Sequence, residues 1–99
     1  MRFEWDPGKA KANERKHKVG FSEACLIFAD KFELTLRDEA HSDDEERWIT
    51  VGQLPDGKCL VVVHTFSSIS GEEAVRIISA RTATKPELKL YHERRKGAR

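Results

Sequence analysis

The sequence predicts an α+β fold, in which helices pack on one mainly antiparallel sheet. Two helix signals near the start precede a long run of strand-like segments, and a third helix signal follows them. The 99 residues suffice for one hydrophobic core, so we expect a single domain over residues 1–99. Charged residues make up 35% and the apolar set AVILMFWYC 38%, a balance typical of globular rather than disordered chains.

The first twenty residues predict an edge strand followed by a helix. The apolar and aromatic segment 2–5 is the expected strand. Asp6 is the expected N-cap, and Pro7 fills the first helical position, where its missing N–H costs nothing. The helix is expected to run to about His17 and to end at residues 18–20, with basic residues suited to its negative end.

A second, buried helix is expected next. Ser22 can cap it, while Phe21 and Leu26 are spaced like a hydrophobic staple. Residues 24–29 are apolar on nearly every side, which indicates burial, and residues 30–31 end the segment.

The remainder of the chain predicts four strands and a last helix. The strands are expected at residues 32–37, 47–54, 58–66 and 74–80, separated by a charged loop at 38–45 and turns at 55–57 and 67–71. Thr84 or Lys85 then opens a helix that turns Leu88, Leu90 and Tyr91 inward. We expect the basic tail 94–99 to fray.

Several classes of protein are excluded by composition. No apolar stretch is long enough to span a bilayer and no export signal is visible, so we expect a cytoplasmic protein. Cys25 and Cys59 lie among apolar neighbours, which favours two buried, reduced thiols. The four histidines are far apart and lack ligand partners at short spacing, so no metal site or other cofactor is expected.

Charge is segregated along the chain. Residues 1–20 carry a net charge of +3, residues 21–57 carry −7 and residues 58–99 carry +5, which sums to the overall +1. If the two basic blocks meet in the fold, they form a surface that attracts phosphates, whereas the acidic middle would repel them or receive a basic partner. Ordinary variation of solvated charge is the other interpretation.

Two pairs of polar residues at element ends could act on a phosphate ester. Lys16 and His17 end the first helix, where they bind a phosphate or simply interact with the helix terminus. Glu46 precedes Arg47, and it could take a proton from a ribose hydroxyl or form a structural ion pair.

Three further charged or titratable residues lie inside expected strands. His64 interrupts an apolar run and is either a core residue or a catalytic one. Arg76 could hold a scissile phosphate, or it pairs internally with Glu46 or Glu87. Arg81 is five residues later, so in a regular strand the two arginines would lie on opposite faces unless a bulge intervenes.

Large aromatic residues offer a different possibility. Trp5, Trp48 and Tyr91 could stack on RNA bases, although aromatics in a small chain are more often part of the core.

Taken together, these residues resemble the BrnT family of bacterial toxins. The opening WDxxKxxxNxxKH stretch and the segment RIISARxA carry the resemblance in combination, and it extends from Phe3 to Tyr91. The matching positions are Trp5-Asp6, Lys9, Asn13, Lys16-His17, Phe21, Ala24, Phe28, Asp30, Glu46-Arg47, Gly52, Arg76 to Arg81, Ala83, Glu87 and Tyr91.

The resemblance implies a ribonuclease toxin of a type II toxin–antitoxin system with a RelE-like fold. Such a toxin cleaves RNA and arrests translation and growth, and a small DNA-binding antitoxin, BrnA, neutralises it. The complex represses its own operon, and the antitoxin supplies the contact to operator DNA. A homodimer and a toxin–antitoxin hetero-oligomer are both compatible with this interpretation, and no membrane partner is expected.

A metal-independent ribonuclease needs a base for the ribose 2′-hydroxyl, cations at the phosphate and an acid for the leaving 5′-oxygen. The hypothesis assigns Glu46 or His17 as base, Arg76 and Arg81 as phosphate-stabilising cations, His64 or Tyr91 as acid, and Lys9, Lys16 and Arg47 as contacts to the RNA. The alternative is a catalytically inactive module that binds antitoxin or nucleic acid and takes part in operon autoregulation.

Overall fold

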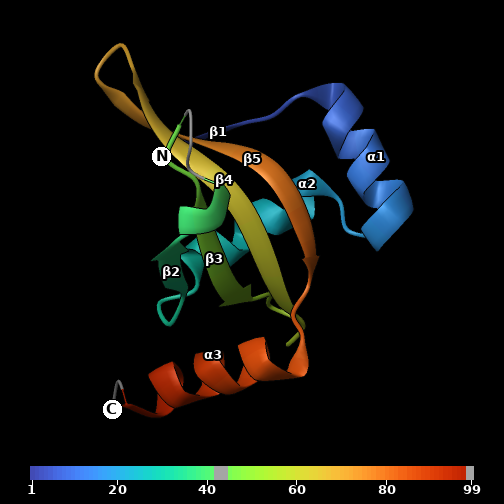
Figure 1. The fold of residues 1–99 in the computed structure, drawn as a ribbon, viewed down its shortest axis with the longest axis vertical. Helices are drawn as coiled ribbons and strands as arrows, with labels where there is room; N and C mark the ends of the chain where they lie inside the picture. The colour runs from blue at the N-terminus through green and yellow to red at the C-terminus, as the bar shows by residue number, and fades with distance from the viewer. Residues whose placement is uncertain (42–44, 98–99) are drawn as a thin grey trace.

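The computed structural model describes residues 1–41 and 45–97, and it confirms the expected α+β architecture (Figure 1). A strand and two helical segments come first, four mutually antiparallel strands follow, and a helix ends the described chain. The elements in order are β1 (Arg2–Glu4), α1 (Pro7–His17), α2 (Phe21–Ala24), the 3-10 helix η1 (Cys25–Ala29), β2 (Leu34–Arg37), the 3-10 helix η2 (Glu39–His41), β3 (Trp48–Gln53), β4 (Cys59–Ile69), β5 (Glu72–Thr82) and α3 (Lys85–Gly97).

The five strands form one sheet in the order β1-β5-β4-β3-β2. β1 runs parallel to β5 and pairs only with its first half, from Ala74 to Arg76. The other neighbouring strands are antiparallel, and tight turns join β3 to β4 and β4 to β5. Because β1 is so short, it leaves the second half of β5 along the sheet edge for another element to cover.

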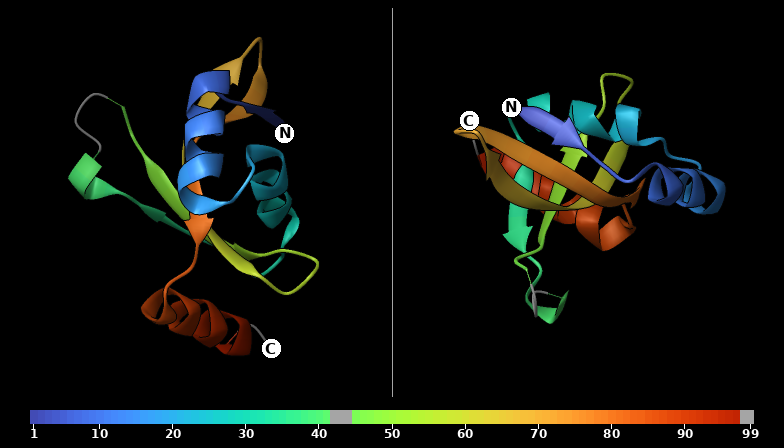
Figure 2. Two further views of the ribbon diagram at one scale, coloured as in Figure 1. Left: turned by 90° about the vertical axis from the view of Figure 1, so that its right-hand side faces the viewer. Right: turned by 90° about the horizontal axis from the view of Figure 1, so that it is seen from above.

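The two faces of the sheet have different surroundings. The packed face carries Leu60, Val62 and Ile77, and α2 and η1 lie against it (Figure 2). The opposite side, the open face, carries Ile49, Val63 and the other residues that alternate with the buried set. α1 lies beside the sheet rather than across it (Figure 2).

The main core lies between the packed face and the helical segments. Its buried members are Val19, Phe21, Ala24, Ile27, Leu54, Leu60, Val62, Val75, Ile77 and Ala80. Gly52 of β3 allows η1 to approach, because a Cβ at this position would lie 2.8 Å from the Cβ of Ile27 and 3.0 Å from its carbonyl oxygen. A side chain at position 52 would therefore push η1 away from the sheet.

α3 covers only one end of the open face. Tyr91 is fully buried there and packs with Val51 and Val61, which are opposite each other on β3 and β4. The remainder of the open face is more accessible, since the Leu36 side chain at its far edge is 51% exposed. This leaves a broad, partly apolar surface in front of β3, β4 and β5.

The expected boundaries of α1 are confirmed. The Asp6 carboxylate accepts a hydrogen bond from the Lys9 backbone N–H at 2.9 Å, and Pro7 occupies the first helical position. The helix ends after His17, and Lys18 takes the left-handed conformation with φ of 60°.

The expectation for the second helix is wrong in two details. The helix begins at Phe21, one residue before Ser22, and Gly20 occupies the capping position without a side-chain hydrogen bond. Phe21 is anchored in the core at 2% exposure, so burial rather than a hydroxyl cap fixes the start. The chain then tightens into η1, which buries Ile27 and leaves Leu26 half exposed.

Two expectations about the second half of the chain are also wrong. The turn at 67–71 is shorter, because β4 continues to Ile69 and pairs with Glu72 at the start of β5. α3 continues to Gly97, where the side chains of Arg94 and Arg95 donate to Glu33 and Gln53, and residues 98–99 of the tail expected to fray lie outside the described residues. Leu90 points outward at 48% exposure, since Tyr91 takes the inward position.

Both cysteines are free thiols, but only Cys59 is buried as expected. Cys59 is buried and Cys25 is half-buried, and burial raises the pKa of both thiols. Among the described residues, no helix is long and apolar enough to cross a membrane.

Candidate functional site

One side of α1 faces the uncovered half of β5. It carries four polar side chains from the WDxxKxxxNxxKH stretch, at spacings of four, three and one residues that belong to one helical face: Lys9, Asn13, Lys16 and His17. These side chains line a shallow pocket of about 230 Å³ whose other wall is Ile78 and Ser79. The structure therefore brings three of the predicted site residues together at the edge of the sheet.

Asn13 holds α1 in this position. Its amide nitrogen donates to the carbonyl oxygens of Val19 at 3.0 Å and Ala80 at 2.8 Å, and its amide oxygen accepts from the Ala80 N–H at 3.0 Å. These bonds satisfy both backbone groups of Ala80 on the edge that β1 does not reach. The Asn13 side chain thus takes the place of a neighbouring strand.

A bulge interrupts the pairing of β4 and β5. Val63 is opposite Ser79, whereas the next residue of β4, His64, is opposite Ile77. Ile78 is therefore an extra residue in β5, and it lies beside the α1 pocket.

The bulge places the two candidate arginines on the same face of the sheet. Arg76 is opposite Thr65 and Arg81 is opposite Val61. Thr65 and Val61 are four residues apart on β4, so their side chains lie on the same face of the sheet. The extra residue is in β5 rather than in β4, so this alternation along β4 is not interrupted. Both arginines consequently project from the open face, which an unbroken β5 would have prevented.

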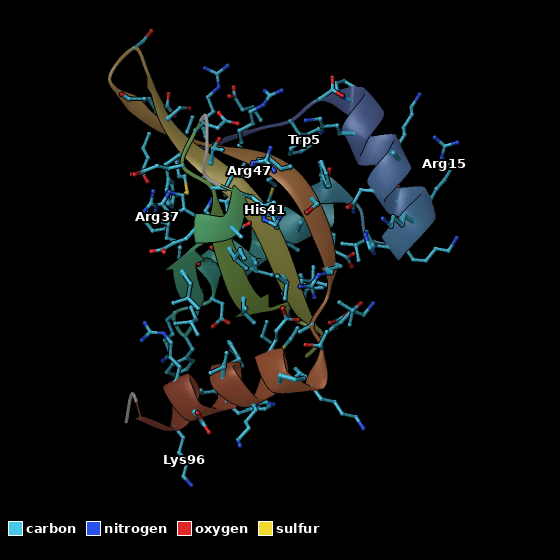
Figure 3. The ribbon with its side chains drawn as sticks, in the orientation of Figure 1. Trp5, Arg15, Arg37, His41, Arg47 and Lys96 are labelled. Atoms are coloured by element: carbon cyan, nitrogen blue, oxygen red, sulfur yellow. The ribbon has the colours of Figure 1, made fainter. Side chains whose placement is uncertain are left out.

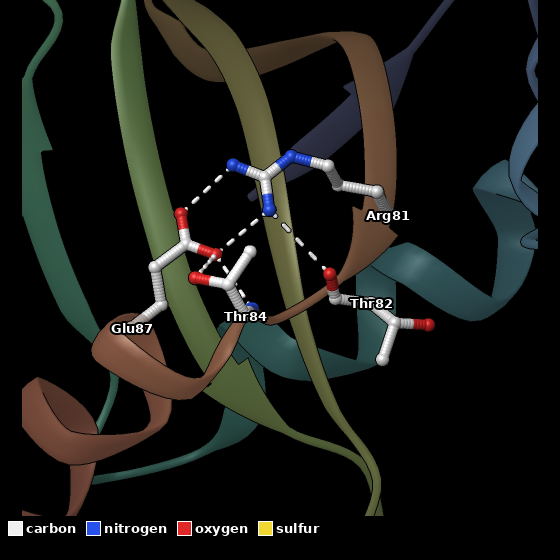
Figure 4. A network of polar contacts seen from close by, with 4 residues as sticks. All are labelled: Arg81, Thr82, Thr84 and Glu87. Carbon is white, nitrogen blue, oxygen red and sulfur yellow. Dashed lines mark hydrogen bonds and ion pairs between the residues drawn. The ribbon is translucent and has the colours of Figure 1, made fainter.

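Arg81 is engaged by a carboxylate. Its two terminal nitrogens donate to the two oxygens of Glu87 at 2.7 and 2.8 Å, and Glu87 also accepts from the backbone N–H and hydroxyl of Thr84 (Figure 4). The hydrogen bond from Arg81 is the main reason that the pKa of Glu87 falls to about 2, and it raises the pKa of Arg81. This ion pair connects β5 to the start of α3.

Arg76 is held more loosely. Its ion pair is with Glu4 rather than with Glu46 or Glu87, the two partners that the sequence suggested. The nitrogen–oxygen distance is 3.9 Å, and 44% of the Arg76 side chain is exposed. Such a pair contributes little to stability and leaves the guanidinium open to a stronger anion. The two arginines therefore differ in what they can do, although they share one face.

Arg47 lies immediately before β3, next to Trp48, the first residue of this strand that pairs with β4. Its carbonyl accepts from the Asp38 N–H at 2.8 Å, so the pairing on the β2 side of β3 continues to this residue. β4 lies between β3 and β5, so Arg47 and Arg76 are at least about 10 Å apart. Figure 3 shows Arg47 in front of the strands, where the half-buried side chain borders the open face.

Glu46 is not brought to the α1 pocket. Its carboxylate lies 3.8 Å from Arg37 and is 65% exposed, at the β2–β3 edge of the sheet. β3 and β5 are separated by β4, so the two regions are at least about 10 Å apart.

His64 is a core residue in this structure. It is fully buried between the rings of Phe28 and Phe66, and its Nε2 forms a hydrogen bond with the Thr50 hydroxyl at 2.7 Å. Burial lowers the pKa of His64 to about 4. It faces the packed side of the sheet, whereas Arg76 projects from the open face.

Tyr91 is also fully buried. Its hydroxyl donates to Asp30 at 2.6 Å, and burial together with this carboxylate raises the pKa of Tyr91 to about 12. Asp30 additionally accepts from the backbone N–H groups of Phe32 and Gln53. Tyr91 therefore anchors α3 to two other segments of the chain.

The two tryptophans are engaged by other aromatic rings. Trp5 makes an edge contact with Phe21, with ring centres 6.0 Å apart, and Trp48 packs against Phe66 at 5.8 Å. Both are half-buried, and Figure 3 shows Trp5 between α1 and the sheet.

Sequence reasoning assigned no role to Ser79 and none to Asn13 beyond its place in the motif. The position of Asn13 could have indicated its role. Asn13 is an uncharged polar residue on the helix face that also carries Lys9 and His17, and such a residue must find hydrogen-bond partners when it is buried. Ser79 gave no comparable signal, because its approach to α1 depends on the bulge. Among residues 1–41 and 45–97, no group of three or more His, Cys, Asp or Glu side chains is arranged to hold a metal ion.

Comparison with known proteins agrees with this fold. The crystal structure of the Brucella abortus ribonuclease toxin BrnT superposes with a TM-score of 0.62, at 22% sequence identity, over 86% of this chain and 99% of that one. No curated protein matches the chain. The family model described as the ribonuclease toxin BrnT of type II toxin–antitoxin systems matches residues 5–87. The chain belongs to the BrnT family of ribonuclease toxins.

Proposed function

We propose that this protein cleaves RNA without a metal ion, using the surface between α1 and the second half of β5. The observation that carries the proposal is the meeting of Lys9, Lys16 and His17 with Ser79 at one pocket, beside the exposed Arg76. Cations from two elements attract the phosphodiester, and the imidazole of His17 can accept a proton from a hydroxyl of the substrate.

In the proposed reaction, His17 takes the proton of a ribose 2′-hydroxyl and the 2′-oxygen attacks the adjacent phosphorus. The phosphorus–5′-oxygen bond breaks, the departing oxygen takes a proton from water, and a 2′,3′-cyclic phosphate remains. Arg76 stabilises the additional negative charge on the phosphate, and Lys9 and Lys16 hold the neighbouring backbone.

Of the two expected bases, the geometry favours His17 over Glu46, because Glu46 lies at the β2–β3 edge of the sheet and does not line the α1 pocket. His64 and Tyr91 are left out as acids, since a general acid must come within hydrogen-bond reach of the leaving oxygen and both are fully buried. Arg81 acts indirectly in this proposal, through the position of α3. Arg47 contacts RNA where its side chain borders the open face.

The proposed cellular role follows the family. Cleavage of RNA in the cytoplasm arrests translation and growth, and a BrnA-like antitoxin neutralises the toxin and supplies the contact to operator DNA. Expression in bacteria without the antitoxin should stop growth, and co-expression should restore it.

The decisive experiment is cleavage of purified RNA in EDTA by the wild-type protein and by three variants. His17→Ala and Arg76→Ala should each lose about 100-fold or more in rate, and products should end in a cyclic phosphate. Lys11→Ala is the matched control, because Lys11 is exposed on the side of α1 away from the pocket. Normal cleavage by folded Arg76→Ala would contradict the assignment. No cleavage by the wild type, with or without added ribosomes, would favour the inactive antitoxin-binding module.

A further inference from the structure

A second group of cations gathers far from the α1 pocket, at the end of α3. Lys31, Phe32, His92, Arg95 and Lys96 line a shallow pocket of about 600 Å³. We propose that this group, the α3-end cluster, binds backbone phosphates of the RNA substrate outside the cleavage site. The inference rests on the proposed function, and it concerns where a longer RNA is held.

Tertiary structure creates the α3-end cluster. The Arg94 side chain donates to the Glu33 carbonyl at 2.9 Å, and Arg95 donates to the Gln53 side chain at 2.9 Å, so α3 remains ordered to its basic end. Lys31 comes from the turn before β2, about sixty residues earlier in the chain. A frayed basic tail would not hold these charges at a fixed distance from one another.

Two of the cations share one aromatic ring. The Lys31 ammonium lies 5.2 Å from the centre of the Phe32 ring and the Arg95 guanidinium 5.3 Å from it. These cation–π contacts offset part of the repulsion between like charges. The negative end of the α3 dipole favours basic residues in the helix itself, but it does not account for Lys31, which lies outside the helix.

The charge of the α3-end cluster is poorly neutralised by the protein. In the part of the chain that the structure describes, none of its cations lies within 4.0 Å of a carboxylate oxygen. Arg95 also acts electrostatically on Asp30, but that carboxylate is already occupied by hydrogen bonds from Tyr91, Phe32 and Gln53. A polyanion is the partner that relieves such a surface.

The position of the cluster indicates an extended strand rather than a single phosphate group. α3 starts beside Arg81 on the open face and ends at the cluster, and Figure 1 shows its end far from α1. Lys85, Lys89, His92 and Lys96 are spaced by four, three and four residues, so they form one stripe of about 16 Å along the helix. An RNA strand leaving the cleavage site can follow this stripe, whereas a dinucleotide cannot reach its end.

The test is binding of a single-stranded 2′-O-methyl RNA of about 20 nucleotides, which lacks the attacking hydroxyl and is longer than one single-strand site. Fluorescence anisotropy at several salt concentrations compares the wild type with Lys31→Glu/Lys96→Glu. We expect the double variant to bind at least tenfold more weakly at low salt. Its slope of log affinity against log salt should fall by about 1.4, the value for two lost phosphate contacts.

The matched control is Lys11→Glu/Arg15→Glu, which changes the net charge equally on the outer side of α1, where Figure 3 shows Arg15 pointing into solvent. It should change affinity less than threefold. Lys31→Gln/Lys96→Gln, with thermal unfolding recorded in parallel, separates lost binding from lost folding and should weaken binding by a smaller factor. Cleavage of a dinucleotide should be unchanged in every one of these variants.

The outcomes separate the two proposals. Unchanged RNA affinity and slope in Lys31→Glu/Lys96→Glu, with an active enzyme, would overturn the α3-end cluster alone. An equal loss of RNA affinity in Lys11→Glu/Arg15→Glu would show that the change in net charge alone weakens binding, and it would also overturn the α3-end cluster. Tighter binding of duplex DNA than of RNA of the same length would show that the α3-end cluster binds a different partner, and it would overturn the proposal. Absence of cleavage of purified RNA by the wild type, with or without ribosomes, would instead count against the proposed function.

Discussion

Asn13 and Ala80 are joined by a pair of hydrogen bonds, in which the side-chain amide of one accepts from and donates to the backbone of the other at 3.0 and 2.8 Å. The residues are 67 positions apart, and they connect the helix that carries Lys9, Lys16 and His17 to the strand that carries Arg76. The candidate site is therefore assembled through a contact that copies the pairing of two strands.

Asn13→Ala should destabilise the protein by about 2–4 kcal/mol, because it leaves three buried backbone groups without a partner. Urea unfolding measures this loss, and Lys11→Ala, at an exposed position of the same helix, should change stability by less than about 0.5 kcal/mol. Equal stability of the two variants would show that the Asn13 contacts do not hold α1.

Gly52→Ala should also destabilise the protein, by about 1–3 kcal/mol, because the new methyl group would meet Ile27 at 2.8 Å. Gly20→Ala is the matched control, since nothing lies within 4 Å of a Cβ at that position. Thermal unfolding of both variants distinguishes the steric effect from the general effect of replacing a glycine.

Because His64 is buried, we expect the folded protein to lose stability in weak acid. Burial lowers its pKa from 6.5 to about 4, so the unfolded chain binds the proton more readily than the folded protein. The free energy of unfolding is therefore highest above pH 6.5, where His64 is neutral in both states. It falls by about 3 kcal/mol as the pH is lowered toward 4.

Unfolding free energies measured between pH 7 and 4 test this dependence. His64→Gln should lower stability at pH 7 and flatten the dependence, while His92→Gln, at an exposed position, should retain it. A wild-type stability that stays constant over this range, once the other groups are accounted for, would contradict the buried, neutral state of His64.

Tyr91→Phe separates a structural role from a catalytic one. The hydroxyl donates to Asp30 at 2.6 Å, and its removal should cost about 1–3 kcal/mol because a charged acceptor loses a buried partner. Cleavage per folded molecule should remain within a few-fold of the wild type. A loss of about 100-fold in rate with unchanged stability would instead identify Tyr91 as the acid.

Arg81 and Glu87 should behave as one unit. Arg81→Ala and Glu87→Ala should each lower stability by about 1 kcal/mol, and the double variant should lose little more than either single variant. Since the pKa of Glu87 is lowered to about 2, this contribution is complete above pH 4.5 and is lost as the pH falls toward 2. Additive losses in the double-mutant cycle would contradict the pairing.

The candidate site was predictable only in part. The helix face of Lys9, Lys16 and His17 follows from their spacing, and the structure does bring these residues together. The relation of Arg76 to Arg81 was not predictable, because one extra residue at Ile78 reverses which face the later half of β5 presents. The sequence suggested Glu87 as a partner of Arg76, whereas the structure pairs Glu87 with Arg81, because the register of β5 could not be read from spacing alone.

The sequence by itself determined the features that neighbouring residues control. Asp6 and Pro7 start α1, strand-like alternation gives the order of the elements, and the motifs indicate the family. Tertiary structure alone decided which side chains are buried and which charges meet. His64 is enclosed by η1 and β4, and Lys31 joins the end of α3. The physical reason is range: capping and periodicity act within a few residues, whereas strand register, desolvation and ion pairing depend on segments distant in the chain.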